Sequence, residues 1–239
     1  MTLKRIFIAL TFSTLFAITS CGQTTVTIPK EFVETVPPKA GGDDWYPLNY
    51  SQNEFGVKII DGKLDIKQVK EVNKCELKIT GGTLIGINSG EWGGQLTFKP
   101  DDTTKKIVEI KRGNIKFIFN FKDKVYFIEG LAHLSYSGGA IFELNTADNN
   151  FTFTKLVDFD DAPEAFSIYK DKFLIATHEN FYIVQDFKKE LVFKETFWSS
   201  LYPNSIAVLD DKNVFIGIRS GIVKLNLTDK TLKFYKNDK

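Results

Sequence analysis

Two histidines, His133 and His178, are the only imidazole groups in this sequence. Four carboxylates occur in the same predicted connecting segments: Glu91, Asp160, Asp161 and Glu164. Imidazole and carboxylate groups together can bind a metal ion or exchange protons near neutral pH. No ligand pair has the i, i+2 or i, i+4 spacing of a local metal motif, so solvated or hydrogen-bonded loop histidines are favoured. The sequence also lacks a Ser–His–Asp order, a nucleotide-binding loop and a cysteine pair, so no catalytic residue is assigned.

Aromatic side chains in the same segments could recognise a protein or a sugar, because large amphipathic rings dominate binding surfaces. The alternative is that each ring packs under its own loop. Trp92 is the first choice, since Gly90, Gly93 and Gly94 leave its indole without covering side chains. The predicted binding residues are Glu91, Trp92, His133, Tyr136, Trp198, Tyr202 and Asn204.

The elements that carry these residues are repeats. Four units each contain four short β-branched or aromatic runs separated by polar turns: Cys75–Ile110, Ile115–Val157, Ala165–Phe197 and Ser205–Tyr235. Runs of this length joined by tight turns predict antiparallel neighbours, and therefore a four-stranded meander in every unit. The second runs begin at Thr83, Val125, Phe173 and Val214, a period of roughly 40–50 residues.

The second run of each unit is nearly continuous in apolar residues, as in Val214–Gly217. A strand covered on both faces by neighbouring sheets loses the polar alternation of an exposed strand. Gly86, Ala176 and Gly217 recur at one register of these runs, which indicates close packing between units.

This pattern resembles the β-propeller superfamily, in which each blade is a four-stranded meander. The expected fold is all-β, with four clear blades over residues 75–235. A hairpin over Phe55–Val69, turning at Asp61-Gly62, is expected to form a partial fifth blade that closes the ring. The alternative is a separate hairpin that caps an open array of four blades. The Trp-Asp mark of WD40 blades and the kelch pattern are absent, so the resemblance carries no activity with it.

Propellers of the lactonase and gluconolactonase type place acidic and Asn residues around a calcium ion in the central channel. Glu164 and Asn204 begin the predicted innermost strands of units three and four, so that resemblance makes them weak metal candidates. No cofactor other than calcium is suggested.

The turns of a meander alternate between two edges. Short turns form one edge, which we call the turn rim: residues 81–82, 122–124, 170–172 and 210–213. Longer and more varied connections form the other edge, which we call the loop rim: residues 88–94, 130–137, 158–164 and 198–204. Variable loops on a rigid scaffold commonly carry binding sites, so the loop rim is the predicted functional face.

The N-terminus has the pattern of an export signal, with Lys4 and Arg5 before the apolar run Ile6–Ile18. Small residues before Cys21 resemble the lipobox of bacterial lipoproteins. That resemblance implies a signal peptide over 1–20 and acyl chains on Cys21. In enterobacterial lipoproteins an Asp after the cysteine favours the inner membrane, so the resemblance, with Gly22 at that position, implies the outer membrane, facing the periplasm. The alternative is an ordinary secretory signal with an incidental cysteine.

Residues 21–50 contain many Thr, Pro, Gly and Asp residues and are predicted to be a flexible tether, followed by the propeller-like domain over 51–239. The 31 basic residues nearly balance the 30 acidic ones, so charge gives no reason to expect nucleic-acid binding. Only Cys75 remains if Cys21 is lipidated, which leaves no intramolecular disulfide.

These observations predict a non-enzymatic, lipid-anchored binding protein of the cell envelope that recognises a protein or a glycan through the loop rim. The alternative is a metal-dependent propeller hydrolase or lyase with its site in the central channel.

Overall fold

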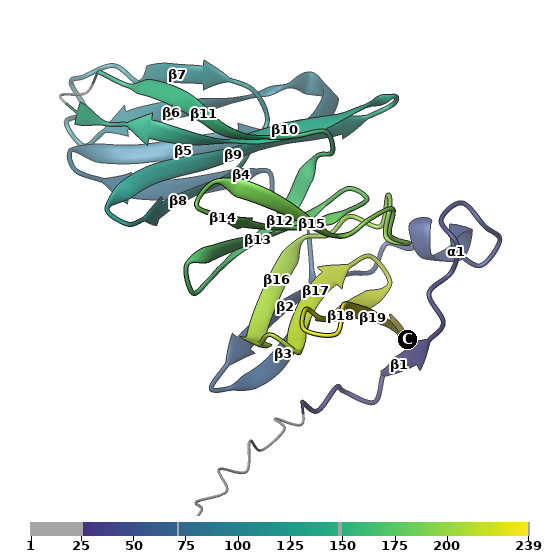
Figure 1. Cartoon of the computed structure of the whole chain (residues 1–239). Coiled ribbons are helices and arrows are strands. Elements are labelled where there is room, and N and C mark those ends of the chain that lie inside the picture. Colours follow the sequence, from purple (N-terminus) through teal and green to yellow (C-terminus); the bar gives the residue numbers. More distant parts are fainter. Residues whose placement is uncertain (1–25, 71, 148–149, 239) are drawn as a thin grey trace, which may run out of the picture.

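A computed structural model describes residues 26–70, 72–147 and 150–238, and its regular secondary structure is almost entirely antiparallel strands (Figure 1). Sheet I contains β4 (Lys74–Ile79), β5 (Gly82–Asn88), β6 (Gly94–Pro100) and β7 (Val108–Arg112). Sheet II contains β8 (Ile115–Phe121), β9 (Lys124–His133), β10 (Tyr136–Asn145) and β11 (Thr152–Phe159). Sheet III contains β12 (Pro163–Tyr169), β13 (Lys172–Thr177), β14 (Phe181–Gln185) and β15 (Lys188–Phe193). The expected all-β fold with repeated four-stranded antiparallel sheets is thus confirmed.

Sheet IV contains β16 (Ser205–Asp210), β17 (Asn213–Ile218), β18 (Gly221–Asn226) and β19 (Thr231–Asn237), with β1 (Phe32–Thr35) added beside β19. A two-stranded hairpin contains β2 (Glu54–Ile60) and β3 (Lys63–Val69). Two short helices complete the described elements: α1 (Tyr46–Asn49) and the 3-10 helix η1 (Gly90–Trp92).

The second strand of each sheet is the most buried, as its continuous apolar sequence predicts. Every residue of β17 is buried, and all residues of β13 except Lys172 are buried. Both faces of these strands lie against side chains of neighbouring sheets, so there is no exposed face for polar residues. The largest apolar cluster joins sheets III and IV and includes Leu174, Trp198 and Ile216.

Sheets that follow one another in the chain pack side by side, and the first strand of each sheet contacts the preceding sheet. β8 packs against β4 and β5, β12 packs against β8, β9 and β10, and β16 packs against β12. The hairpin continues this order, because β2 packs against β16, β17 and β18. The hairpin therefore takes the place, beside sheet IV, that the first strand of another sheet would take.

Two glycines show the same packing rule. A methyl group on Gly86 would meet Ile115 Cγ2 of β8 at 2.6 Å, and one on Gly217 would collide with the carbonyl oxygen of Phe55 in β2. The small residues at this register of the second strand are therefore needed for the close approach of the next first strand.

The hairpin and sheet I are the first two β-sheet units in the chain. The described residues show no comparable packing between them, and they lie apart in Figure 1. The structure accordingly supports several four-stranded sheets in sequence order.

Residues 26–50 differ from the predicted flexible tether. β1 pairs with β19, the last strand of the chain, through partners such as Phe32 and Asn237. Trp45 and Leu48 are buried, and Trp45 Nε1 donates to the carbonyl oxygen of Phe197 at 3.0 Å. These apolar side chains fasten the segment to sheet IV. The predicted signal peptide and Cys21 lie outside the described residues.

The predicted loop over 130–137 is also different. β9 continues to His133 and β10 begins at Tyr136, so only Leu134 and Ser135 form the turn. The two strands remain paired to this end, with Tyr136 opposite His133, and carry the turn outward on the loop rim.

Candidate functional site on the loop rim

The structure brings four of the predicted binding residues together at the border of sheets I and II. His133 Nε2, at the end of β9, lies 3.2 Å from Glu91 Oε2 of η1, and β9 contacts η1 here. Trp92 is 86 % exposed and Tyr136 is 59 % exposed. Leu134, which the sequence did not single out, is 93 % exposed. We call these five residues the sheet I–II patch.

Trp198 does not belong to an exposed binding surface, so this part of the prediction is wrong. Its side chain is fully buried between sheets III and IV, and its Nε1 donates to the carbonyl oxygen of Thr177 at 3.2 Å. The indole instead anchors the connection from sheet III to sheet IV, which also carries Ser200 and Tyr202.

Tyr202 is 44 % exposed and covers Arg219, whose guanidinium carbon lies 4.2 Å from the ring centroid. Arg219 Nη2 donates to Glu54 Oε1 at 2.7 Å, and Nη1 donates to the carbonyl oxygen of Asn49 at 2.8 Å. Arg219 therefore ties the hairpin and α1 to sheet IV. Asn49 Nδ2 in turn donates to the carbonyl oxygen of Ser200 at 2.8 Å.

A linear hydrogen-bonded group lies where sheets III and IV meet. Glu164 Oε1 lies 3.1 Å from His178 Nδ1, and His178 Nε2 lies 3.3 Å from Ser200 Oγ. The Glu164 side chain is 8 % exposed and that of His178 is 18 % exposed. The order hydroxyl, imidazole, carboxylate is the arrangement by which enzymes activate a serine.

The environment of His178 has opposing effects on its proton affinity. Burial of the imidazole lowers its pKa, but the hydrogen bond and the negative charge of Glu164 raise it more, so the pKa of His178 lies above its ordinary value. The charges of Asp161 and Glu179 act in the same direction.

Asp161 fixes the segment that carries His178. Its carboxylate accepts hydrogen bonds from Ser137 Oγ at 2.8 Å, from the Glu179 amide at 2.8 Å and from Asn180 Nδ2 at 2.8 Å, and it also accepts one from Thr177 Oγ1. A carboxylate with four donors is a structural hub, and its oxygens are already used. Asp160 by contrast points into solvent, with its side chain 94 % exposed.

Glu164 and Asn204, the two weak metal candidates, each keep one buried side-chain atom without a hydrogen-bond partner. These atoms are Glu164 Oε2 and Asn204 Nδ2. They stand at the beginnings of the neighbouring strands β12 and β16, which pack together. Across the described ranges, no three His, Cys, Asp or Glu side chains are grouped so that they could hold a metal ion.

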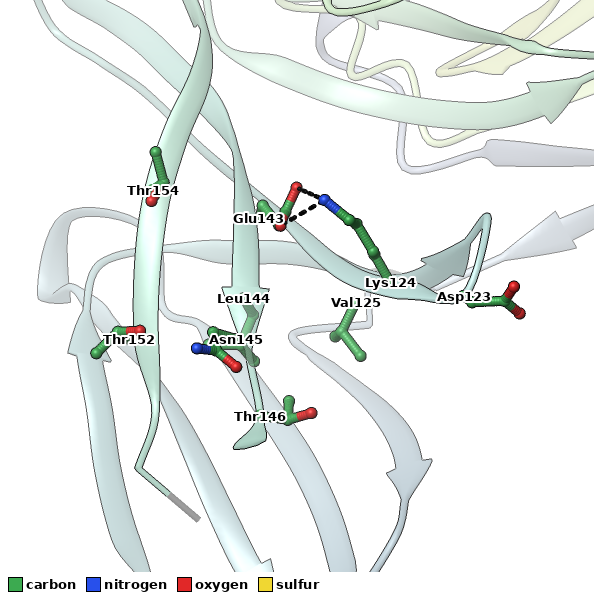
Figure 2. Close-up of a pocket in the computed structure, with 9 residues that line it drawn as sticks. All are labelled: Asp123, Lys124, Val125, Glu143, Leu144, Asn145, Thr146, Thr152 and Thr154. Carbon is green, nitrogen blue, oxygen red and sulfur yellow. Dashed lines mark hydrogen bonds and ion pairs between the residues drawn. The ribbon is translucent and has the colours of Figure 1, made fainter. Parts of the chain in front are cut away.

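The turn rim of sheet II contains a cavity of 440 Å³ between the ends of β9, β10 and β11 (Figure 2). Lys124 Nζ lies 2.9 Å and 3.0 Å from the two carboxylate oxygens of Glu143 there, and threonine side chains line much of the remainder. Of the charged groups labelled in Figure 2, Lys124 and Glu143 are closed into this ion pair, and the carboxylate of Asp123 points away from it. The loop rim therefore remains the candidate site.

Part of the Glu164–His178–Ser200 group could have been found from the predicted meander. The start of a first strand and the end of the next strand are neighbours, and Pro163 pairs with Thr177 in the structure. This register places Glu164 beside His178. Ser200 enters from a connection between sheets, for which the sequence contains no pairing signal.

The chain matches no model of a known protein family, and no curated protein is significantly similar to it. Within the described part of the chain, no helix has the length and hydrophobicity needed to cross a lipid bilayer.

Proposed function

We propose that this chain is a lipid-anchored protein of the bacterial cell envelope that binds a protein or a glycan through its loop rim. The sheet I–II patch is the observation that supports this most directly. An exposed indole, a phenol and a leucine are carried by the same two segments as the His133–Glu91 contact, and such a mixture of aromatic and hydrogen-bonding groups suits binding. Single exposed apolar residues are common, but three on two segments that meet through His133 and Glu91 favour a contact surface.

The fold underlying this proposal is a β-propeller with a partial fifth blade. Two observations support it. The hairpin meets sheet IV as the first strand of another blade would, and Gly217 approaches β2 at the register where Gly86 approaches β8.

Replacing Trp92 by Ala should remove the main anchor of the binding surface. The expected loss is about 2 kcal/mol of binding free energy, or roughly 30-fold in Kd. The melting temperature should stay unchanged, because the indole is 86 % exposed. Binding would be measured on a glycan array and with envelope proteins isolated on the wild-type chain.

Ile107→Ala is the matched control, since Ile107 is 60 % exposed on the turn rim of the same sheet and should not affect binding. If Trp92→Ala melts early and binds normally once folded, Trp92 packs and does not bind.

Lipid anchoring predicts that Cys21→Ala abolishes labelling by radioactive palmitate and releases the protein from the membrane fraction. Val26 and Ile28 already pack in the cluster around Phe55 and Phe215, so the fold begins close to the proposed anchor. The thermal stability of the mature domain should therefore be the same with or without the acyl chains. A wild-type protein without palmitate label would disprove the anchor.

The second candidate function is a calcium-dependent hydrolytic centre in the central channel that the sheets would surround in a propeller. It is favoured by the unpaired buried atoms of Glu164 and Asn204. Bound calcium would raise the melting temperature by mass action, and EDTA would reverse that rise.

A further inference from the structure

The Glu164–His178–Ser200 group has an order and spacing that go beyond what a binding surface needs. The imidazole contacts a serine hydroxyl at 3.3 Å through Nε2 and a carboxylate at 3.1 Å through Nδ1. A carboxylate on Nδ1 fixes the tautomer in which Nε2 is free to accept the hydroxyl proton. Distances slightly longer than an ideal hydrogen bond are usual for a nucleophile and its base before substrate binds.

The three side chains are held by independent supports. The His178 amide donates to the carbonyl oxygen of Ala162 at 2.9 Å, and Asp161 holds the residues around His178. The carbonyl oxygen of Ser200 accepts from Asn49. Ser200 has a φ of +57°, a conformation that costs free energy for a residue with a Cβ. A residue with a Cβ keeps a positive φ only where the surrounding structure holds it in that conformation, and its side chain is then held in one place as well.

The group is also incomplete as a purely structural network. A buried network that serves only stability normally satisfies its polar atoms. Glu164 Oε2 and Asn204 Nδ2 remain unpaired, although the Glu164 side chain is only 8 % exposed. One unused acceptor and one unused donor on the neighbouring strands β12 and β16 are suited to a polar ligand.

We propose that Ser200 and His178 form a nucleophilic site that hydrolyses a carboxylic ester, with Glu164 as the positioning residue for His178. Ser200 Oγ forms a bond to the ester carbonyl carbon, and its proton passes to His178 Nε2. The bond from that carbon to the alcohol oxygen then breaks, and the alcohol leaves with the proton from His178. Water then attacks the acyl carbon of the acyl-serine and gives a proton to His178. The bond from that carbon to Ser200 Oγ breaks, Ser200 Oγ takes the proton back from His178, and the carboxylic acid leaves. Ester and water thus become acid and alcohol, and no other reactant is needed.

This activity is independent of the proposed binding function. The sheet I–II patch lies on η1 and the β9–β10 turn, whereas the nucleophilic site lies on β12, the end of β13 and the connection to β16. Failure of one proposal therefore leaves the other unaffected.

The direct test is covalent labelling of the purified mature chain with a fluorophosphonate, followed by mass spectrometry of the labelled peptide. Wild type should carry the phosphonyl group on Ser200. Ser200→Gly should prevent labelling and should keep the fold, because glycine adopts a positive φ without strain. Ser199→Ala is the matched control: Ser199 Oγ donates to Glu179 Oε1 at 3.3 Å, and its loss should leave labelling of Ser200 intact.

The second measurement is the hydrolysis of p-nitrophenyl acetate in the presence of EDTA, which separates this site from a calcium-dependent centre. His178→Gln should lower the rate about 100-fold or more, the usual contribution of a general base. The wild-type rate should rise with pH as His178 loses its proton, with a midpoint above the ordinary histidine value. Glu164→Gln should move that midpoint to lower pH, because the hydrogen-bonded negative charge that raises the pKa is gone.

Labelling of Ser200 together with this pH profile would establish the site. Absence of label on folded wild type would overturn the proposal. So would label on another residue that survives Ser200→Gly, or a Glu164→Gln variant with an unchanged pH midpoint.

Discussion

Adding one methyl group at Gly217 is expected to push the β2–β3 hairpin away from sheet IV. The new Cβ would lie far inside van der Waals contact with the Phe55 carbonyl oxygen, and 2.6 Å from Ser205 Oγ. A backbone carbonyl cannot rotate away without moving β2. Ser205 Oγ also accepts from the Val57 amide at 2.9 Å, so the bond that holds the hairpin would be strained at the same time.

We expect Gly217→Ala to cost about 3 kcal/mol of the free energy of unfolding, at the upper end of ordinary overpacking. For a domain of this size the melting temperature should fall by roughly 6–12 °C. Guanidinium unfolding would measure the loss. Limited proteolysis should find new cleavage sites within the hairpin, because its packing on β16 and β17 is weakened.

Gly86→Ala is the matched control. The three atoms nearest to its Cβ would belong to side chains, namely Ile115 Cγ2 at 2.6 Å, Cys75 Sγ at 2.7 Å and Ile115 Cβ at 2.9 Å, and side chains can shift more easily than backbone. The expected cost is about 1 kcal/mol. Lys212→Ala, an exposed position on the turn rim, should stay within about 0.5 kcal/mol. If Gly217→Ala and Lys212→Ala lowered the free energy of unfolding equally, the hairpin would not depend on close packing against Gly217.

Trp198→Ala is expected to have the largest effect on stability of any single tryptophan substitution in the chain. The indole is fully buried in the cluster between sheets III and IV, and the amide oxygen of Thr177 would lose its donor. Truncating a buried aromatic side chain costs about 3–5 kcal/mol, so the melting temperature should fall by roughly 10 °C or more.

Two variants separate the reasons for this loss. Trp198→Phe keeps most of the apolar contact but removes the hydrogen bond to Thr177 and part of the indole volume, so it should cost about 1–2 kcal/mol, less than the alanine variant. Trp92→Ala removes the same side chain from an exposed position and should stay within about 0.5 kcal/mol. If the two alanine variants melted at the same temperature, the assignment of one tryptophan to the core and one to the surface would be wrong.

The Trp198 variants also bear on the proposed ester hydrolysis. Ser200 follows Trp198 in the same connection, and the Leu201 amide donates to the carbonyl oxygen of Trp198 at 2.7 Å. Loss of the indole should therefore disturb the position of Ser200 as well as the core. For this reason the nucleophile is tested with Ser200→Gly, which leaves the indole in place.

The local architecture could be predicted from the amino-acid sequence alone. Alternating and continuous apolar runs, with Asp, Asn and Gly between them, predict short antiparallel strands because each strand needs only its neighbour in the chain. The four meanders, the buried second strands and the hairpin at Asp61-Gly62 all follow from such neighbouring pairs, and the structure contains each of them. The need for a small residue at Gly217 was also visible from the repeat.

Contacts between distant parts of the chain could not be predicted from the sequence and are seen only in the folded molecule. β1 joins β19 across almost the whole sequence, and nothing in Phe32–Thr35 alone indicates that partner. Trp92 and Trp198 were both predicted to be binding residues of the loop rim, yet Trp92 is exposed and Trp198 is buried. Burial in a connection depends on which sheet lies beneath it, and a period-two pattern carries no information about that.

The Glu164–His178–Ser200 group shows the same division within one site. Strand pairing within sheet III places Glu164 beside His178, and the sequence contains that pairing as a meander. Ser200 reaches His178 only because Trp198 is buried under the connection and Asn49 holds its backbone from α1. Hydrophobic burial of one indole and a hydrogen bond from a segment 151 positions away are long-range effects, so only the folded chain could reveal the complete group.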